Sequence, residues 1–378
     1  MDLALLMHVL VVNAGSSSMK LRLLDDQDGV LATENLPSIE SSGAAQLAST
    51  IEAMTETAGV RVDAVGHRVV HGGTIFSGPV VVDDGVRAAL DRLTDLAPLH
   101  QPKSLAALDA VTAVLPEVPA VACFDTAFHA TIPPAASTYA VPREWRERYS
   151  VRRFGFHGLS HAYCARRSAE LVGRPPEGLR IITCHLGAGA SLTAVVDGRS
   201  VDTTMGFTPL DGLVMATRSG SVDPGLVLWL EEHEHLRPTD LATALEYRSG
   251  LLALAGTADM RVVEARAAQG DADAELALDV FIHRLVTSVG AMVAAAGGCD
   301  VLAFTGGVGE RSPTVRARTV DRLAYLGARL DRAANAAADG DSDIGSASSM
   351  LRTLVVTARE DLQIAADTRR LLELVHPT

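Results

Sequence analysis

The sequence predicts an α/β protein built from two similar halves, each with a mixed β-sheet and flanking helices. Its 378 residues are enough for about two domains. One pattern also occurs twice, at residues 10–34 and 181–204: an apolar run, a Gly/Ser-rich turn, a second run, an Asp-Gly turn and a third run. This is the pattern of a three-stranded antiparallel meander. The other apolar runs alternate with stretches of helical spacing, as in α/β domains.

The first half continues from its meander with alternating helices and strands. Its predicted elements are, in order, helix 43–59, strand 62–70, helix 84–96, helix 101–115 and strand 118–124. Pro102 supports the start of one helix, because proline is favoured in the first helical turn. Residues 131–143 contain three prolines and are predicted to connect the two halves.

The second half follows the same alternation. Its predicted elements are, in order, helix 160–172, the second meander, a helix beginning at Asp223-Pro224, helix 271–296, strand 301–304, strand 354–356 and helix 360–375. Residues 331–349 are rich in Ala, Asp, Gly and Ser and are predicted to form a surface loop. Ligands of such sheets bind at the carboxyl ends of the strands, where the glycine-rich turns fall.

The composition excludes several kinds of partner. A net charge of −13 argues against nucleic acid or an anionic membrane as the main partner. No apolar run is expected to span a bilayer, and the apolar start of the chain lacks the basic region of a signal peptide. Residues 1–6 are expected to be a short extension ahead of Met7. The four cysteines form no CxxC pair, which indicates reduced thiols in a cytoplasmic protein.

The two glycine-rich turns are candidate phosphate-binding sites. The first, Asn13 to Ser18, offers backbone N–H and hydroxyl donors, with Lys20 just beyond it. It is not a P-loop, because it lacks the GK[ST] ending and a strand follows it. A plain tight turn is the alternative. The second copy, at residues 185–189, favours phosphate binding, with one polyphosphate held between the two turns.

Two arginines are candidate anion-binding groups. Arg68 lies inside an apolar strand, where a guanidinium is costly unless it is paired. It is interpreted as a clamp for a carboxylate or phosphoryl group, with an internal ion pair as the alternative. Arg218 lies in a loop just before a predicted helix start and close to Gly220. An ordinary exposed loop arginine is the alternative there.

Four further positions could carry chemistry. Asp125 ends a strand and could cap a turn, hold a metal or accept a proton. His157 is flanked by Phe156 and Gly158, which favours a site over a core histidine. Glu360 has the spacing of a capping box with Thr357, and a metal role would require it to face a cleft. The turn TGGVGE at residues 305–310 suits a nucleotide, although the motif alone is weak.

Together these segments resemble the acetate kinase family. The resemblance runs almost end to end and is carried by VVNAGSSSMKL, VGHRVVHGG, APLHQP, FDTAFHATIP, RFGFHGLSH, HLGAGAS, DTTMGFTPLDGL, TRSGSVDPG, ADMR, FTGGVGERS and REDLQIAADT. It implies two ribonuclease-H-like domains of the actin-like ATPase fold. The expected domains are residues 1–149 with the C-terminal helix 362–378, and residues 150–361 with the nucleotide-binding segments.

The resemblance also implies roles for individual residues. Asp125, Arg68, Arg218 and His157 would be catalytic, and Arg68 would also bind the substrate together with Val70, Leu99, Phe156 and Pro209. The nucleotide would contact Ser16, Ser18, Lys20, His185, Leu186, Gly187, Ala188, Gly189, Asp259, Met260, Arg261, Gly306, Gly307, Val308, Gly309 and Glu310, and the metal would lie near Asn13 and Glu360. Ala188, Ala216 and Phe154 depart from the family pattern, where Asn, Gly and Tyr are usual.

The implied activity is reversible, Mg²⁺-dependent transfer of the ATP γ-phosphoryl group to acetate, by direct in-line attack. A propionate kinase, a nucleotide-dependent binding module without turnover, and an inactive scaffold are the alternatives. The implied assembly is a homodimer, and the Ala-rich helix from Asp271 is the candidate contact.

Overall fold

The computed structural model describes residues 7–15, 18–37, 39–97 and 101–375, which form two compact units. Unit 1 comprises Met1–Ala130, Gly158–Tyr163 and Arg359–Thr378, and unit 2 comprises Thr131–His157 and Cys164–Ala358. Residues 131–149 were expected in the first domain but belong to unit 2. The Thr131 hydroxyl donates to the Ser200 carbonyl, and the Arg153 N–H donates to the Ser137 carbonyl, so this segment packs with the second sheet. Residues 359–361 belong to unit 1, because helix α15 begins at Glu360.

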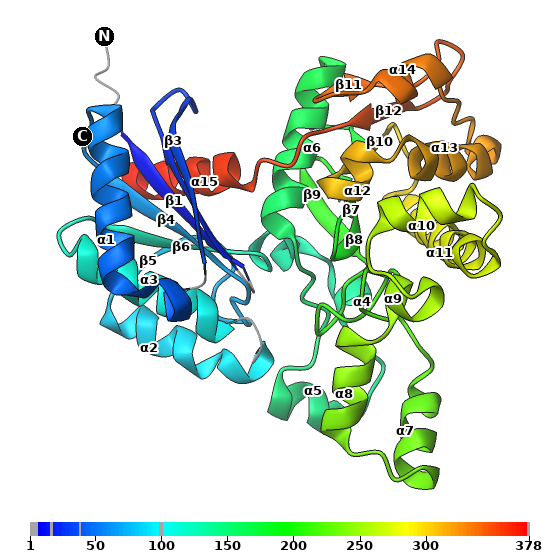
Figure 1. Cartoon of the computed structure of the whole chain (residues 1–378), viewed down its shortest axis with the longest axis horizontal. Helices are drawn as coiled ribbons and strands as arrows, with labels where there is room; N and C mark the ends of the chain where they lie inside the picture. Colours follow the sequence, from blue (N-terminus) through cyan, green and yellow to red (C-terminus); the bar gives the residue numbers. More distant parts are fainter. Residues whose placement is uncertain (1–6, 16–17, 38, 98–100, 376–378) are drawn as a thin grey trace. The chain divides into compact units, whose positions relative to one another are not determined.

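The sheet of unit 1 begins with the predicted meander (Figure 1). Its strands are β1 (Val9–Ala14), β2 (Ser18–Leu24), β3 (Val30–Pro37), β4 (Ala64–Val69), β5 (Val80–Val81) and β6 (Ala120–Phe124), in the order β3-β2-β1-β4-β6-β5. The pairs β1–β2 and β2–β3 are antiparallel, whereas β1–β4 and β4–β6 are parallel. The sheet is therefore mixed, as predicted.

The sheet of unit 2 repeats this arrangement. Its strands are β7 (Arg180–Leu186), β8 (Ala190–Val196), β9 (Arg199–Thr203), β10 (Val301–Thr305), β11 (Ser342–Asp343) and β12 (Arg352–Val355), in the order β9-β8-β7-β10-β12-β11. Antiparallel pairs again form the meander, and β7–β10 and β10–β12 are parallel. The duplication seen in the sequence is thus a duplication of strand order and direction.

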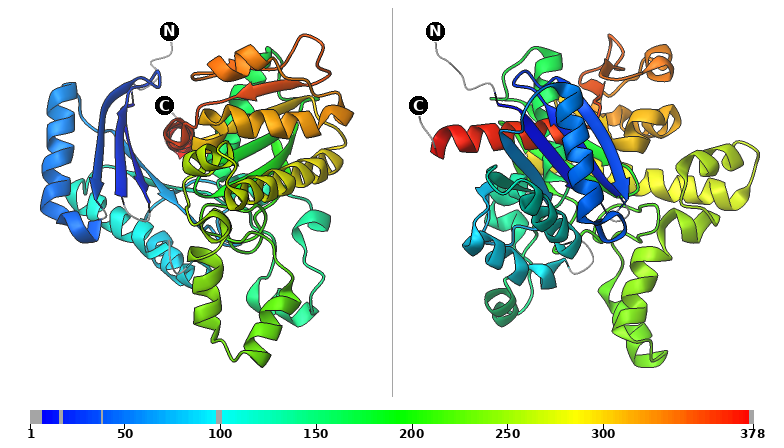
Figure 2. Two further views of the ribbon diagram at one scale, coloured as in Figure 1. Left: turned by 45° about the vertical axis from the view of Figure 1, so that its right-hand side comes forward. Right: turned by 60° about the vertical axis from the view of Figure 1, so that its left-hand side comes forward.

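Helices cover both faces of the unit 1 sheet (Figure 2). Helices α1 (Ile39–Ala58) and α3 (Gln101–Val114) pack on one face, and α15 (Glu360–Val375) packs on the other, while α2 (Asp84–Arg92) packs against α3. Strand β1 alternates between the two cores: Leu10 packs with the α1 and α3 side, and Val11 with the α15 side. A Cβ at Gly66 would lie 2.6 Å from Ile364 and Thr368, so α15 lies close against β4 because residue 66 is glycine.

The long helix of unit 2 belongs to the core of that unit. Unit 2 contains α4 (Pro134–Ser137), α5 (Arg143–Tyr149), α7 (Pro224–His233), α8 (Pro238–Tyr247), α9 (Gly250–Ala255), α10 (Met260–Ala267), α11 (Ala272–Ala296), α12 (Gly306–Arg311), α13 (Pro313–Arg322) and α14 (Arg332–Ala337), and α6 (Gly158–Val172) begins in unit 1. By length and composition alone α11 could cross a membrane, contrary to the expectation from the sequence. It packs instead against β8, α9 and α10, burying Leu278, Ile282 and Val289.

One predicted loop was wrong. Residues 331–349 contain α14 and β11. The Asp331 side chain accepts from the Ala334 N–H and begins the helix, and Asn335 and Ile344 are buried. Tertiary packing of these two side chains outweighs the turn-like composition, which is a weak predictor by itself.

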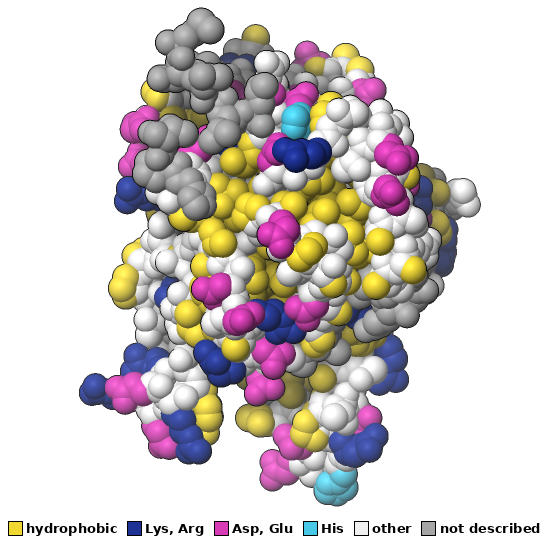
Figure 3. All heavy atoms as spheres, turned by 90° about the vertical axis from the view of Figure 1, so that its left-hand side faces the viewer, with side chains coloured by type: hydrophobic (Ala, Val, Ile, Leu, Met, Phe, Trp, Pro, Cys, Tyr) yellow, Lys and Arg dark blue, Asp and Glu magenta, His cyan; other side chains and the backbone are white. Residues whose placement is uncertain are grey.

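Apolar groups are also exposed on both units. Hydrophobic side chains occupy much of the middle of the face in Figure 3, which is the α1 side of unit 1. Helix α1 exposes Ala44, Ala45 and Ala53, which are small residues with high helix propensity. In unit 2, α7 has no buried residue and exposes the larger Leu228 and Trp229.

Candidate active site

In unit 1 the candidate residues meet at the carboxyl ends of β1, β4 and β6. The Arg68 Nε and Nη2 atoms donate to Asp125 Oδ1 and Oδ2 at 3.0 and 2.5 Å, and Nη1 donates to Asn13 Oδ1 at 3.3 Å. Asn13 Nδ2 donates in turn to Glu360 Oε2 at 3.0 Å. The internal ion pair named as the alternative for Arg68 is therefore formed. Since a guanidinium carries five N–H donors, two of them remain for a ligand.

This ion pair is withdrawn from water. The Arg68 side chain is 18% exposed and that of Asp125 is 2% exposed. Burial alone would lower the pKa of Arg68, but the nearby Asp125 and Glu360 carboxylates raise it well above its ordinary value. Burial raises the pKa of Asp125, and the Arg68 guanidinium opposes that shift. Arg68 is thus a permanent cation whose position is fixed by a bidentate carboxylate.

Glu360 is not part of a capping box. The Thr357 N–H donates to Asp341 Oδ1, and Glu360 instead accepts from Asn13. Within the described residues, Glu360 Oε1 has no hydrogen-bond partner, and no group of three or more His, Cys, Asp or Glu side chains is arranged to hold a metal ion. Glu360 therefore offers one carboxylate oxygen beside the Asn13 amide.

The first glycine-rich turn joins β1 to β2. The Gly15 N–H donates to the Ser18 carbonyl at 2.8 Å, which closes a tight turn. Lys20 lies on β2 and its side chain is exposed. Ser16 lies outside the described residues, so the phosphate role of this turn stays a prediction.

In unit 2, His157 lies in a strained backbone conformation just before α6. Its φ of 57° and ψ of 24° fall in the left-handed region, which costs of order 1 kcal/mol for a residue other than glycine. Its Nδ1 and the Ser191 hydroxyl share a hydrogen bond of 3.0 Å, and its ring stacks on His185 with centroids 4.4 Å apart. These contacts from β8 and β7 fix the orientation of the imidazole.

Arg218 is a partly buried cation, and among the described residues it has no carboxylate partner. Its Nη1 donates to the Pro209 carbonyl at 3.3 Å and contacts Met215 Sδ at 3.9 Å. No ion pair involving Arg218 is found in the described part of the chain. Burial lowers its pKa, and Glu246 and Tyr247 oppose the shift from further away. Such a guanidinium is suited to an incoming anion, because its burial is otherwise uncompensated.

Gly189 lies between His157 and Arg218. A Cβ at this position would be 3.2 Å from Cε1 and Nε2 of His157 and 3.7 Å from Nη1 of Arg218. The imidazole edge and the guanidinium are therefore both next to the second glycine-rich turn. That turn is closed by a hydrogen bond of 2.9 Å from the Gly187 N–H to the Gly189 carbonyl.

Two of the three predicted nucleotide segments of unit 2, residues 185–189 and 306–310, lie side by side. Thr305 pairs with His185 at the carboxyl ends of β10 and β7, and a Cβ at Gly306 would be 2.8 Å from the Leu186 carbonyl oxygen. Helix α12 starts at Gly306 without a side-chain cap. The backbone N of Gly307 lies 4.0 Å from the position of a Cβ built at Gly187, so the start of α12 is next to the turn at residues 186–189.

Comparison with known proteins identifies the family. A profile described as the Acetokinase family matches residues 32–366. The chain belongs to the acetokinase family. It is 45% identical to an acetate kinase of Deinococcus deserti, over 97% of this chain and 98% of that protein. It is 44% identical to an acetate kinase of Thermosipho africanus, again over 97% and 98%.

Solved structures agree with this assignment. The acetate kinase of Porphyromonas gingivalis matches with a TM-score of 0.89 and 35% identity, covering 97% of this chain and all of that chain. A propionate kinase of Francisella tularensis matches with a TM-score of 0.89 and 34% identity, covering 96% and 99%. The two-domain actin-like ATPase fold is thus confirmed, and the chain is an ATP-dependent carboxylate phosphotransferase of the acetokinase family.

The other residues that the acetokinase resemblance assigns to the nucleotide lie at the start of α10 and within α12. Arg261 is exposed and pairs with Asp259 at the start of α10, while Met260 is buried. The Glu310 carboxylate accepts from the Ala358 N–H at 3.0 Å, so it holds the end of unit 2. Val308 and Gly309, which were also predicted to contact the nucleotide, lie within α12.

The expected walls of the acetokinase substrate pocket belong to different units. Val70 is buried in unit 1, directly after β4. In unit 2, Phe156 is buried, and its segment is joined to that of Pro209 because the Phe154 and Gly155 N–H groups donate to the Gly206 carbonyl. Leu99 lies outside the described residues.

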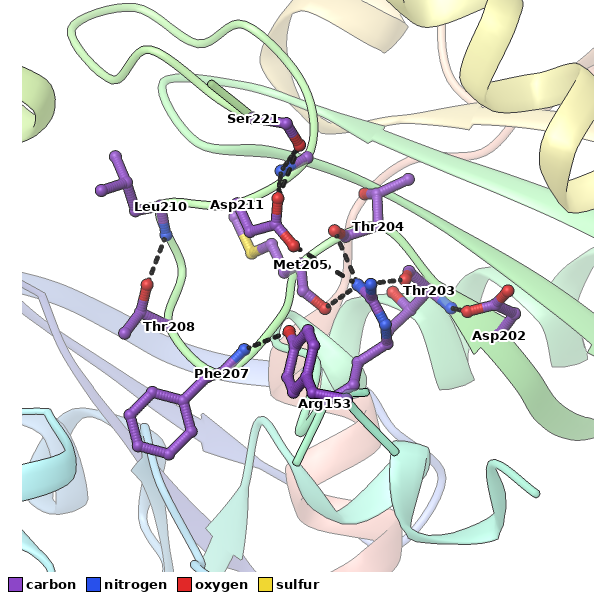
Figure 4. A network of polar contacts seen from close by, with 12 residues as sticks. Arg153, Asp202, Thr203, Thr204, Met205, Phe207, Thr208, Leu210, Asp211 and Ser221 are labelled. Carbon is purple, nitrogen blue, oxygen red and sulfur yellow. Dashed lines mark hydrogen bonds and ion pairs between the residues drawn. The ribbon is translucent and has the colours of Figure 1, made fainter. Parts of the chain in front are cut away.

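The sequence did not reveal three residues that shape this acetokinase site. Ser191 was missed, although its place two residues after Gly189 puts it opposite His185 in the β7–β8 pair. Arg153 and Asp211 were also missed. Figure 4 shows them in a polar network beside the segment that carries Pro209. Neither stands in a pattern that signals its partner, because the network joins residues far apart in the chain.

Proposed function

We propose that the chain catalyses Mg²⁺-dependent transfer of the γ-phosphoryl group of ATP to acetate, giving acetyl phosphate and ADP. The observation that carries this proposal is the partly buried Arg218, which has no carboxylate partner among the described residues and lies next to His157 and Gly189. The curated relatives at 44 and 45% identity are named acetate kinases, which favours acetate as the acceptor.

In the proposed reaction the residues of unit 1 bind the acceptor. Acetate is ionised at neutral pH, so it attacks without a strong general base. The two unused N–H groups of Arg68 would bind its carboxylate, with Asp125 and Asn13 fixing the guanidinium. A carboxylate oxygen forms the new bond to the γ-phosphorus, and the bond from that phosphorus to the β,γ-bridging oxygen breaks.

The residues of unit 2 would neutralise charge on the transferred group. Arg218 and the Cε1–Nε2 edge of His157 both lie next to Gly189, so a phosphoryl group there would meet a cation and an imidazole. The turn at 186–189 and the start of α12 would bind the other phosphates through N–H groups. Positioning and charge neutralisation account for most of the catalysis of phosphoryl transfer.

The side chains near Asn13 fit a magnesium ion held mainly by the nucleotide. Mg²⁺ commonly takes one or two protein oxygens together with phosphate oxygens and water, and Glu360 offers one free carboxylate oxygen. When bound, the ion would draw negative charge from the phosphates. Both oxygens of Asp125 bind Arg68, so we assign Asp125 to positioning Arg68 rather than to the metal.

Propionate is the second candidate acceptor, favoured by the propionate kinase among the similar structures. One methylene changes kcat/KM by roughly 10- to 200-fold, so a direct comparison separates the two. The test is a hydroxamate assay for the acyl phosphate with acetate, propionate and butyrate. We expect the highest kcat/KM with acetate. A higher value with propionate would make the chain a propionate kinase, and no acyl phosphate with any of the three would refute the proposal.

We further propose a cytoplasmic homodimer whose contact includes α7. The candidate from the sequence, α11, buries most of its large apolar residues inside unit 2 and exposes Leu276, whereas α7 exposes Leu226, Leu228 and Trp229 by 47, 63 and 47%. Light scattering after size exclusion should give a dimer for the wild type and a monomer for Leu228→Glu. Leu374→Glu, at a position 74% exposed on α15, is the matched control and should stay dimeric. An unchanged Leu228→Glu dimer would exclude α7 as the contact.

A further inference from the structure

The loop that carries Arg218 is held at two separate places. Residues 204–223 form no helix or strand. Around Arg218 the backbone is tied to α8 and α9: the Ser219 N–H donates to the Leu245 carbonyl, and the Leu251 N–H donates to the Met215 carbonyl. A Cβ at Gly250 would lie 2.2 Å from the Met215 carbonyl oxygen, which shows how closely α9 approaches the loop. These contacts fix the Cα of Arg218.

The guanidinium of Arg218 has a different support. It lies at the end of a long, flexible side chain, and its oxygen contact is the Pro209 carbonyl. The direction of the guanidinium therefore depends on where the segment 206–211 places that carbonyl. This segment is fixed by the network in Figure 4 rather than by α8 and α9.

One end of the segment is held by Arg153. Its Nη1 lies 3.0 Å from each of the carbonyl oxygens of Thr203, Thr204 and Met205. The Phe207 N–H donates to the Tyr139 hydroxyl at 3.0 Å. The chain is thus fixed on the N-terminal side of Pro209.

Asp211 holds the other end. Its Oδ1 accepts from the Ser221 hydroxyl at 2.5 Å, and its Oδ2 lies 3.7 Å from Arg153 Nη1. The Gly212 N–H donates to the Ser221 hydroxyl oxygen, and the Ser221 N–H donates to the Gly212 carbonyl, each at 3.0 Å. One carboxylate therefore links the Arg153 anchor, the segment bearing Pro209 and the base of the loop bearing Arg218.

We propose that Asp211 is a positioning residue for Arg218: it fixes the segment whose Pro209 carbonyl aims the guanidinium at the transferred phosphoryl group. The proposal rests on the role assigned to Arg218 under the proposed function. Because Asp211 acts through geometry, its hydrogen-bond acceptors matter more than its charge, and a displacement of about 1 Å at a charged group is enough to lower the rate by up to about 100-fold.

The test compares kcat and KM across a set of variants. Asp211→Ala should lower kcat at least tenfold while the KM for ATP changes less than about threefold. Asp211→Asn, which keeps the acceptor for Ser221, should restore most of kcat. Ser221→Ala should also lower kcat, by a smaller factor than Asp211→Ala. It replaces Asp211→Ala in the test if that variant does not fold. Asp202→Ala is the matched control: this carboxylate accepts from the adjacent Thr203 N–H and should keep normal kcat.

A double-mutant cycle with Arg218→Lys separates positioning from a general structural role. If Asp211 acts through Arg218, the effect of Asp211→Ala on kcat shrinks in the Arg218→Lys background. An equal effect in both backgrounds, or normal kcat in Asp211→Ala, would overturn the inference. Normal turnover in Arg218→Ala would refute the proposed function itself. An inactive Arg218→Ala combined with a fully active Asp211→Ala would refute only the positioning role.

Discussion

Arg68 and Arg218 are both partly buried arginines next to the carboxyl ends of strands in equivalent sheets, but their surroundings are opposite. Arg68 in unit 1 binds both oxygens of Asp125, and its pKa is raised. Arg218 in unit 2 meets one carbonyl oxygen and a thioether, and its pKa is lowered by burial. The first cation is compensated within the chain, whereas the second is left to be compensated by a ligand. A duplicated fold can therefore carry one guanidinium that is paired with a carboxylate of the chain and one that is not.

The largest expected effect is on turnover in Arg218→Ala. Removing one preorganised charged donor at a transition state lowers kcat by about 100- to 1,000-fold. Because the guanidinium has no carboxylate partner, its removal should leave the free energy of unfolding unchanged within about 1 kcal/mol, or raise it. Steady-state kinetics and urea unfolding measure the two effects. Arg248→Ala, at an exposed position nearby, is the control and should behave as wild type. A large loss of stability in Arg218→Ala would contradict the contrast with Arg68.

Unlike Arg218→Ala, the Asp125→Ala variant should lose stability as well as activity. It leaves the Arg68 guanidinium buried and unpaired, which costs about 3–5 kcal/mol of stability, in addition to lost activity. Both tryptophans, Trp145 and Trp229, lie in unit 2, so unfolding of unit 1 has to be followed by circular dichroism. The double variant Arg68→Met with Asp125→Leu removes both charges and should be more stable than Asp125→Ala. A double variant as unstable as Asp125→Ala would show that packing, and not the ion pair, sets the cost.

Gly189→Ala tests the space next to Arg218 and His157. The new Cβ would be 3.2 Å from the imidazole, closer than ordinary contact, so the imidazole has to shift by a few tenths of an ångström. We expect kcat to fall about tenfold, since small displacements of catalytic groups are costly. Gly290→Ala, within α11, is the control and should keep full activity. A fully active Gly189→Ala variant would show that the transferred phosphoryl group does not bind next to this turn.

The smallest effect is a pH dependence of stability in unit 1. Burial lowers the pKa of His67 to about 4, and its Nε2 has no hydrogen-bond partner in the part of the chain that the structure describes. The folded state binds fewer protons than the unfolded state below the ordinary histidine pKa of about 6.5, so stability falls as the pH drops from about 6.5 to about 4. Between pH 7.5 and 5.5 the loss from one such group is about 1 kcal/mol. Urea midpoints followed by circular dichroism should show a shallower loss in His67→Met. If His67→Met loses as much stability at low pH as the wild type, the pH dependence comes from other titrating groups.

Much of the fold was predictable because it depends on local patterns. The two meanders follow from apolar runs of strand length separated by turn residues, and their register follows from turn length. The start of α7 was correct as well, since the Asp223 side chain accepts from the Gly225 N–H and Pro224 occupies the first helical position. These signals lie within a few residues of one another.

Other parts of the structure could not be predicted from the sequence. Spacing offered Thr357 as a capping-box partner of Glu360, the alternative to a metal role, but the observed partner is Asn13, 347 positions away in the chain. The loop predicted at 331–349 failed similarly, because the burial of Asn335 and Ile344 depends on neighbours outside the loop. The spacing of residues in the sequence can indicate which nearby residue a polar group will bind. It cannot indicate a partner that is distant in the chain.

The sequence by itself determined the duplicated sheets, the glycine-rich turns at strand ends and the presence of two arginines next to them. Only the tertiary structure decided that Arg68 pairs with Asp125, that Ser191 orients His157, and that Arg218 meets no carboxylate among the described residues. The physical reason is that strand and turn formation depend on residues close along the chain. The partners of a buried charge depend instead on which strands are neighbours in the sheet, and pairings such as β1 with β4 and β4 with β6 are set by packing of the whole unit.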